Sequence, residues 1–296
     1  MRGLQFSTSS AALVFAIALA SLFWIALSVS AMESDVPIPV EIEEVAVPNT
    51  AHFPPAQDLH EYIEVMEGCN YAYAGECVRS YAGPGREYAT VNRLRKGIVL
   101  KVGGSVLNDL RVWYRIIFDE PLRYPERVAR AQYVAAEDVR HFYSNGVQTR
   151  GSQGSATHST QLRVEASTSS ASTKHILVDR SEQMLYAYEG ETLFMQVSIS
   201  TGIQLTPTPR GVFTIYKRTP TRYMQGPLPD ISEKYYDLPG VPWNLYFTNE
   251  GGVIHGAYWH KSFGTRWSNG CVNLPLAEAR TLYEWAEVGT KVLVRD

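Results

Sequence analysis

The chain has 296 residues, and 45% of them are hydrophobic, which is enough to bury a core and leaves room for one large or two modest domains plus linkers. Its formal net charge of −3 argues against a nucleic-acid or anionic-membrane binder, because such proteins need a basic surface. The sequence contains no basic stripe with interleaved aromatic residues.

The N-terminus has the pattern of a targeting segment. Arg2 precedes an uncharged apolar run at 11–29, and small and then acidic residues follow this run. Residues 1–31 are therefore predicted to be a secretory signal peptide. Because the run is close to the ~20 residues that a membrane span requires, an uncleaved anchor through residues 11–29 is the alternative. Either version places everything after residue 35 outside the cytoplasm.

The next two segments differ sharply in composition. Residues 32–68 are acidic and contain several prolines, as expected for a linker. Residues 69–142 show a compact β pattern instead, with a turn at 83–88. Strands are expected at Trp113–Ile117 and Tyr133–Val139.

Two of the three cysteines lie close together, at Cys69 and Cys77, with turn-forming residues between them. In an oxidising compartment such a pair can close a small disulfide and leave Cys271 as the free thiol. The alternative is that both cysteines stay reduced and simply pack. A metal site is disfavoured, because no histidine accompanies the pair.

Residues 143–173 are rich in Ser, Thr, Gly and Gln and are predicted to be a flexible linker, since so few apolar groups cannot offset chain entropy. Residues 174–296 are predicted to be mostly β, whereas Arg218–Pro242 shows no clear period and predicts a long loop. Strand-type runs occur at Ile176–Tyr188, Leu193–Ser200, Gly211–Lys217, Leu245–Phe247 and Val292–Val294.

One helix is predicted to begin at Pro275, a residue favoured in a first helical turn, and to end at Gly289. Apolar residues recur there at a spacing of three and four, which predicts a single buried face. This face comprises Leu276, Ala279, Leu282, Tyr283 and Ala286.

The chemistry of the chain concentrates at His255 and Cys271, which lie on two short segments joined by a loop. A cysteine attacks as the thiolate, and a neighbouring imidazole is its usual activator. The small residues before Cys271 leave backbone amides free to face a developing oxyanion. Taken as a pair alone, the two residues are equally compatible with a buried thiol and a structural histidine.

These residues belong to a longer set of motifs that resembles the YkuD-type L,D-transpeptidases. The catalytic signature of that family is similar to His255-Gly256 followed by Ser268-Asn269-Gly270-Cys271-Val272-Asn273. Further matching elements are Ile176–Asp179, Gln183–Tyr188, Ser200-Thr201-Gly202 and Thr206–Phe213. The resemblance covers the chain from Lys174 to the C-terminus. It implies a mainly β protein with a β-sandwich catalytic domain and one short helix after the nucleophile.

The resemblance also assigns roles. Cys271 would be the nucleophile and His255 the general base, oriented by the backbone carbonyl of Gly256. The amides of Gly270 and Cys271 would stabilise the oxyanion. The predicted substrate-binding residues are Trp259, Arg266, Ser268, Asn269 and Asn273, with Arg266 suited to a peptide carboxylate. In the family a segment comparable to 218–242 covers the substrate cleft, which would place Tyr223, Met224 and Trp243 along the groove.

Asn269 departs from the pattern, because the family usually has histidine at this position. Asparagine cannot carry a proton, although its amide can donate and accept hydrogen bonds. If the position only braces the loop or the substrate, the protein is an active enzyme. If the position titrates during catalysis, the protein is impaired.

The segment 69–142 is similar to bacterial Src-homology-3-like domains, which implies a small β-barrel that binds peptidoglycan. Within it, Asp119–Arg130 has two prolines and several charges and looks like an insertion. The alternative is a barrel that only spaces the catalytic domain.

Together, these features predict an exported peptidoglycan L,D-transpeptidase of the cell wall or the outer membrane face. The resemblance implies that Cys271 attacks the third residue of a tetrapeptide stem and expels D-Ala, and that an amine resolves the acyl-enzyme. Neither a metal nor an organic cofactor is required, and no nucleic-acid partner is expected. The alternatives are an L,D-carboxypeptidase and a non-catalytic peptidoglycan-binding protein impaired by Asn269. Sortases and NlpC-type peptidases fit less well, because the former use a different cysteine context and the latter place Cys before His.

Overall fold

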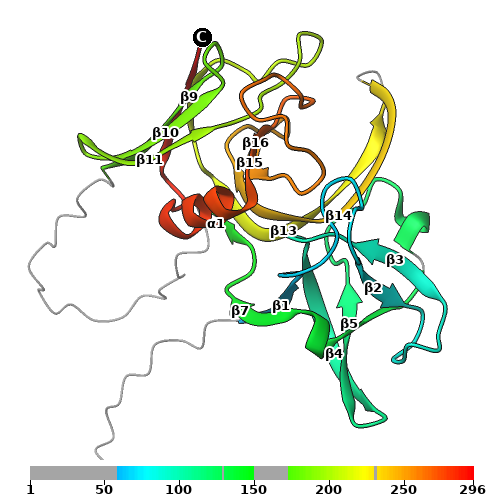
Figure 1. Ribbon diagram of the computed structural model, residues 1–296. Coiled ribbons are helices and arrows are strands. Elements are labelled where there is room, and N and C mark those ends of the chain that lie inside the picture. The colour runs from blue at the N-terminus through cyan, green and yellow to red at the C-terminus, as the bar shows by residue number, and fades with distance from the viewer. Residues whose placement is uncertain (1–58, 129, 150–172, 230–231) are drawn as a thin grey trace, which may run out of the picture. The chain divides into compact units, whose positions relative to one another are not determined.

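The computed structural model describes residues 59–128, 130–149, 173–229 and 232–296. These residues lie in one compact unit that spans Pro54–Asp296. The predicted signal or anchor, residues 32–58 and most of the Ser/Thr-rich segment lie outside the described ranges. None of the helices in these ranges is long and apolar enough to cross a membrane. The mainly β class is confirmed, with a single α-helix among the described residues (Figure 1).

The first sheet has seven strands in the order β3-β2-β6-β5-β4-β1-β7. Its strands are β1 (His60–Glu64), β2 (Val78–Tyr81), β3 (Thr90–Leu94), β4 (Val99–Asn108), β5 (Arg111–Ile117), β6 (Gln132–Ala135) and β7 (Arg140–Ser144). β1 lies within the segment that the sequence predicts to be a linker, yet it pairs with both β4 and β7. Its Tyr62 and Ile63 are buried, which explains why the strand is held in the sheet. The Src-homology-3-like interpretation stays a prediction.

The predicted strand Tyr133–Val139 is wrong in its second half. β6 ends at Ala135, and Ala136–Asp138 form a 3-10 turn. The acidic side chains of this turn face two arginines across the sheet: Glu137 pairs with Arg86 and Arg111. The strand therefore ends after Ala135, where ion pairs of the side chains take the place of buried apolar contacts.

Cys69 and Cys77 form a disulfide, and both side chains are buried. The bond closes a loop with a sequence separation of 8 and so resolves the alternative that the sequence left open. Cys271 is the free thiol of the described residues.

Removing this disulfide should destabilise the protein. A small closed loop restricts the unfolded chain, and the expected loss for the double variant Cys69→Ala/Cys77→Ala is about 2 kcal/mol in the free energy of unfolding. Denaturant unfolding under non-reducing conditions measures it. Equal midpoints for variant and wild type would contradict a stabilising role, and reduction of the wild type should reproduce the effect of the double variant.

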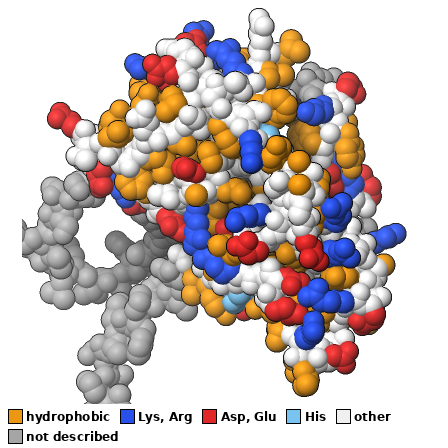
Figure 2. All heavy atoms as spheres, viewed as in Figure 1, with side chains coloured by type: hydrophobic (Ala, Val, Ile, Leu, Met, Phe, Trp, Pro, Cys, Tyr) orange, Lys and Arg blue, Asp and Glu red, His pale blue; other side chains and the backbone are white. Residues whose placement is uncertain are grey.

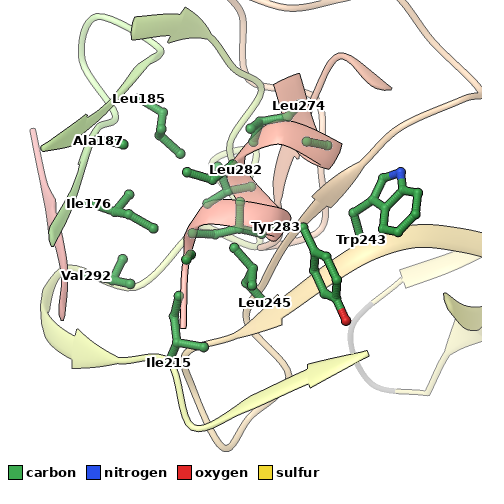
Figure 3. Close-up of a cluster of buried hydrophobic side chains, with 14 of the residues drawn as sticks. Ile176, Leu185, Ala187, Ile215, Trp243, Leu245, Leu274, Leu282, Tyr283 and Val292 are labelled. Carbon is green, nitrogen blue, oxygen red and sulfur yellow. The ribbon is translucent and has the colours of Figure 1, made fainter. Parts of the chain in front are cut away.

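The C-terminal part contains two five-stranded sheets, in the orders β11-β10-β9-β17-β12 and β16-β15-β14-β13-β8. The first contains β9 (Lys174–Asp179), β10 (Met184–Glu189), β11 (Thr192–Ser198), β12 (Gly211–Thr214) and β17 (Lys291–Arg295). The second contains β8 (Gln148–Thr149), β13 (Lys217–Leu228), β14 (Ser232–Tyr246), β15 (Val253–Gly256) and β16 (Val272–Leu274). The main core combines side chains of both sheets and of helix α1, such as Ile176, Leu245 and Leu282 (Figure 3).

The predicted long loop at 218–242 is instead a ribbon of two long antiparallel strands, β13 and β14 (Figure 1). The register of this pair shifts between Arg222 and Met224 and again between Gly226 and Leu228. Each shift breaks the strict alternation that identifies a strand in sequence, so the ribbon has no visible period. Trp243 is buried in the core, which corrects its predicted place along the groove.

Helix α1 (Leu276–Trp285) begins where the sequence predicts, with Pro275 as its N-cap. The predicted end at Gly289 is wrong. Ala286 is already extended, and the amide of Glu287 donates to the hydroxyl of Thr290. Gly289 lies in the turn that follows, at a positive φ of 103°. Ala279, Leu282 and Tyr283 form the buried face, as predicted.

The N-terminal sheet and the C-terminal part share a second core. Ile63, Leu100 and Ile116 of the N-terminal sheet pack in one buried cluster with Val241 and Tyr258 of the C-terminal part. A hydrogen bond from the hydroxyl of Thr221 to the carbonyl of Val99 also joins them. Burial of this apolar surface favours a fixed contact between the two parts. On the face seen in Figure 2, acidic and basic side chains are interspersed.

Candidate active site

His255 and Cys271 lie at the ends of two adjacent parallel strands. His255 belongs to β15 and is opposite Asn273 of β16, while Cys271 directly precedes β16. The flanking Ile254 and Val272 are fully buried and fix both strands in the core. His255 and Cys271 line the same cavity, which has a volume of about 320 Å³. This volume is at the lower end of the range for small-molecule sites, roughly 300–1,000 Å³.

The tautomer of His255 follows from its hydrogen bond. Its Nδ1 is 3.1 Å from the carbonyl oxygen of Gly256, and a carbonyl can only accept, so Nδ1 carries the proton. Nε2 therefore holds the lone pair, and it has no hydrogen-bond partner among the described residues. Burial, with smaller contributions from the charges of Arg222 and His260, lowers the pKa of His255 to about 4, against the opposing effect of the hydrogen bond to Gly256. The ring is neutral at physiological pH and able to accept a proton.

Cys271 is a neutral thiol in this environment. Burial raises the pKa of the Cys271 thiol above its ordinary value, although Arg222 opposes the shift. The residue as a whole is half-buried, and its sulfur lies 3.9 Å from the carbonyl oxygen of Gly251. A neutral thiol and a neutral imidazole that line the same cavity can react by general-base catalysis, in which the proton moves as the sulfur attacks.

The loop that carries Cys271 is braced by its own hydrogen bonds. Ser268 Oγ donates to the carbonyl of Cys271 and accepts from the amide of Gly270. Thr208 Oγ1 donates to the carbonyl of Gly270 and accepts from the amide of Gly202. The motif elements at Ser200–Gly202 and Thr206–Phe213 therefore hold the loop from one side.

Two glycines are required by this arrangement. Gly270 has a positive φ of 110°, which residues with a side chain rarely adopt. At Gly202 a Cβ would lie 2.1 Å from the carbonyl oxygen of Thr206, so the chain passes too closely for any side chain. The Gly270 amide donates to Ser268 Oγ at 3.1 Å, which leaves the amide of Cys271 as the simpler oxyanion donor. The oxyanion role of Gly270 stays a prediction that requires Ser268 to release this amide.

The other predicted substrate-binding residues separate into two groups. Trp259, Ser268, Asn269 and Asn273 line the cavity together with His255 and Cys271. The Trp259 ring lies 5.6 Å from the His255 ring and so covers the base. Arg266 is exposed and does not line the cavity, so the structure does not support its predicted role at a carboxylate.

His260 fixes the side chain of Asn273. Its Nδ1 accepts from the amide of Ser262 at 3.0 Å, and burial lowers its pKa to about 4, so the neutral ring carries its proton on Nε2. Nε2 lies 2.9 Å from the Asn273 amide group and must donate to its oxygen. The assignment of amide oxygen and nitrogen follows from this hydrogen-bond pattern. The Asn273 NH₂ group is then left to donate to a ligand in the cavity.

Residues 173–294 match the family model of the YkuD L,D-transpeptidase catalytic domain. The resemblance to this family that the motifs predict is confirmed over these residues. Members of this family act on the peptide stems of peptidoglycan, outside the cytoplasm. No curated protein matches the chain.

Solved L,D-transpeptidase structures are similar to parts of the chain. A crystal structure of the Enterococcus faecium enzyme is 27% identical over 42% of this chain and 50% of that chain, with a TM-score of 0.38. The Mycobacterium smegmatis enzyme is 19% identical over 66% of this chain and 93% of its own, with a TM-score of 0.40. The Stackebrandtia nassauensis enzyme is 24% identical over 42% and 56%, with a TM-score of 0.34. The match thus spans only half of the Enterococcus faecium chain.

Sequence reasoning missed several residues that line the cavity around His255 and Cys271. Arg222, Tyr236 and Trp267 belong to it, and so does Arg123, which comes from the N-terminal part. Of the three residues predicted along the groove, only Met224 lines the cavity, whereas Tyr223 lines a smaller neighbouring pocket of about 140 Å³. Arg222 lies in a stretch without visible periodicity, so the sequence did not indicate that this residue lines the cavity.

Glu120 lines this neighbouring pocket, and its Oε1 accepts the amide of Tyr223 at 2.7 Å. Burial raises the pKa of Glu120 from 4.5 to about 7, although the Tyr223 amide and Arg222 oppose the shift. The folded protein therefore holds this proton more tightly than the unfolded chain does. The stability linked to Glu120 is complete below about pH 4.5 and is lost as the pH rises towards 7.

The variant Glu120→Gln should remove this pH dependence, because glutamine keeps the acceptor and never ionises. Relative to wild type, its free energy of unfolding should rise between about pH 4.5 and 7, by up to about 3 kcal/mol. Denaturant unfolding across this range measures the difference, in which the histidines common to both proteins cancel. A difference that does not change with pH would contradict the assignment.

Proposed function

We propose that this protein is a peptidoglycan L,D-transpeptidase in which Cys271 and His255 carry out acyl transfer on tetrapeptide stems. The observation that carries the proposal is the pairing of the two groups in one cavity. The lone pair on Nε2 of His255 lacks a partner among the described residues, and Nδ1 is held by the carbonyl of Gly256. A neutral base and a neutral thiol are the ground state that general-base acyl transfer requires.

In the first half-reaction, the Cys271 sulfur attacks the carbonyl carbon of the third stem residue while Nε2 of His255 takes the thiol proton. The negative charge on the carbonyl oxygen is stabilised by the backbone amide of Cys271. As the carbon–nitrogen bond breaks, the imidazolium returns the proton to the amine of the leaving D-Ala. The product is a thioester on Cys271.

In the second half-reaction, an amine of another stem attacks the thioester carbon. His255 takes a proton from this amine as the carbon–sulfur bond breaks, and the thiolate of Cys271 recovers that proton. The new amide is the cross-link. If water attacks instead, the same steps give an L,D-carboxypeptidase, so the acceptor alone distinguishes the two activities.

Asn269 is compatible with this mechanism. Its side chain is exposed and lines the cavity, and no step above needs a proton carrier at that position. The position of Asn269 suits contact with the substrate. A non-catalytic peptidoglycan-binding protein is the alternative if a proton carrier proves necessary there.

We also place the protein outside the cytoplasm, at the cell wall or the outer membrane face, because its proposed substrate is there. Residues 1–31 would direct export as a signal peptide or membrane anchor. The N-terminal sheet would hold the enzyme at peptidoglycan.

An exchange assay tests the activity. The protein is incubated with a disaccharide-tetrapeptide and excess D-methionine, and the products are identified by mass spectrometry. Replacement of the terminal D-Ala by D-methionine is the expected result. A tripeptide without exchange would assign the protein as an L,D-carboxypeptidase. If neither product forms, the alternative of a non-catalytic peptidoglycan-binding protein is favoured.

A further inference from the structure

The predicted insertion of the N-terminal part packs against the β13–β14 ribbon. The amide of Tyr124 donates to the Gln225 side chain at 2.9 Å, and the Tyr124 hydroxyl donates to the carbonyl of Pro227 at 3.0 Å. Arg127 donates to the carbonyl of Gly226 at 2.8 Å and lies 3.7 Å from Asp237. These contacts fasten the insertion at Tyr124 and Arg127, beside the catalytic cavity.

Arg123 directly precedes Tyr124 and lines the cavity together with Cys271 and His255. Arg222 of β13 lines it as well. Within the described ranges, neither arginine has an ion-pair or hydrogen-bond partner. One terminal nitrogen of Arg222, Nη1, is buried without a hydrogen-bond partner, and the guanidinium lies over the Tyr246 ring at 5.5 Å from its centre. Leaving a buried donor of a charged group unpaired is unfavourable, so a ligand that pairs with it gains binding energy.

The charges around the cavity favour an anion. Arg123, Arg222 and Lys234 line it, with Lys234 placed over the Trp267 ring at 5.7 Å. Glu250 is the single carboxylate among the described lining residues, and it is exposed. A guanidinium presents its donors in a fork that matches the two oxygens of a carboxylate.

We propose that Arg123 and Arg222 form a subsite that binds a carboxylate of the donor peptide next to the bond that Cys271 attacks. This inference rests on the proposed function. A tetrapeptide donor has two carboxylates near that bond, on the leaving D-Ala and on the side chain of the diamino acid. The small cavity places the subsite within reach of either group. The N-terminal part therefore contributes directly to substrate selection, and Arg123 replaces Arg266 as the residue for a carboxylate.

The subsite can be tested without turnover, by alkylating Cys271. Iodoacetate carries a carboxylate, whereas iodoacetamide is its neutral counterpart, and Cys69 and Cys77 are protected in their disulfide. The ratio of the iodoacetate rate to the iodoacetamide rate, compared with that of free cysteine, should be raised in the wild type. It should fall by about 10-fold or more in Arg123→Gln and Arg222→Gln. Arg115→Gln is the matched control, because Arg115 is an exposed arginine of β5 away from the cavity.

Kinetics with three donors then identify the carboxylate. The donors are the tetrapeptide, its C-terminal D-alaninamide, and the tetrapeptide amidated on the diamino-acid side chain. Arg123→Gln should lower kcat/KM by about 10- to 100-fold on the unmodified donor. It should have no effect on the one amide that lacks the bound carboxylate. Arg123→Lys should restore part of the activity, because the charge is kept while the fork is lost.

The two proposals fail in different ways. Unchanged alkylation ratios in both arginine variants, with equal losses on all three donors, would overturn the subsite. A loss of the iodoacetate preference in Arg266→Gln alone would overturn it as well. If the ratio of the iodoacetate rate to the iodoacetamide rate falls in the arginine variants but no donor is turned over, the subsite is supported. The proposed transpeptidase activity is then overturned.

Discussion

Replacing Cys271 by alanine is expected to lower the rate of acyl transfer by a factor on the order of 10⁴ or more, while the fold is retained. The side chain is the only free thiol of the described residues, and the other two cysteines form a disulfide. Without the sulfur no thioester can form, and the remaining cavity can only bind the stem. Because Cys271 is not fully buried, the loss of one sulfur atom should cost little stability.

Two measurements check this result. The rate of D-methionine exchange gives the loss of activity, and intact-protein mass spectrometry detects the acyl adduct that the wild type forms and Cys271→Ala does not. Cys271→Ser is the matched variant, since a hydroxyl is a much weaker nucleophile at the same position. Exchange by Cys271→Ala at a rate close to that of the wild type would exclude covalent catalysis by this residue.

The second large effect is expected for His255→Gln, which removes the base but keeps a polar side chain of similar length. At about pH 7 the exchange rate should fall by about 10³-fold, at the level of a missing general base. The thiol of the variant must ionise unaided, and burial holds its pKa above the ordinary value. The residual rate should therefore rise with pH throughout the neutral and alkaline range.

The wild-type rate should instead be independent of pH around neutrality, as far as His255 controls it. The pKa of His255 is lowered to about 4, so the base stays unprotonated until the pH falls near that value. The acid limb of kcat/KM should have its midpoint near pH 4 instead of near 6.5, the ordinary histidine value. Asn269→His is the control and should keep this profile, because Asn269 carries no proton in the mechanism. An acid limb near 6.5, or a large gain in Asn269→His, would contradict the assigned roles.

The sequence predicted those features that depend on neighbours along the chain. The signature around His255 and Cys271 is local, because two adjacent strands and one loop bring its residues together. The position of helix α1 followed from Pro275 and from apolar spacing on one face. The mainly β class followed from short alternating runs. In each case the pattern lies within one short stretch of the chain, which is the range over which motifs and periodicity can be recognised.

The sequence failed where burial on one face is not regular. The β13–β14 ribbon was predicted as a loop, because its register shifts at Arg222 and again at Gly226. Strand β1 was assigned to a linker, because its few residues follow a proline-rich stretch and become buried only between β4 and β7. The disulfide between Cys69 and Cys77 was left open, since spacing alone does not bring two sulfur atoms together.

The sequence by itself predicted His255 and Cys271 as the reacting groups, and it predicted the resemblance that the family model confirms over residues 173–294. Only the tertiary structure decided what surrounds them. Arg123 and Arg222 meet at one cavity because an insertion of the N-terminal sheet packs on the β13–β14 ribbon. A motif specifies chemistry through residues that are close in sequence. The charged side chains around the cavity come from distant segments that pack together, and no local sequence pattern predicts this packing.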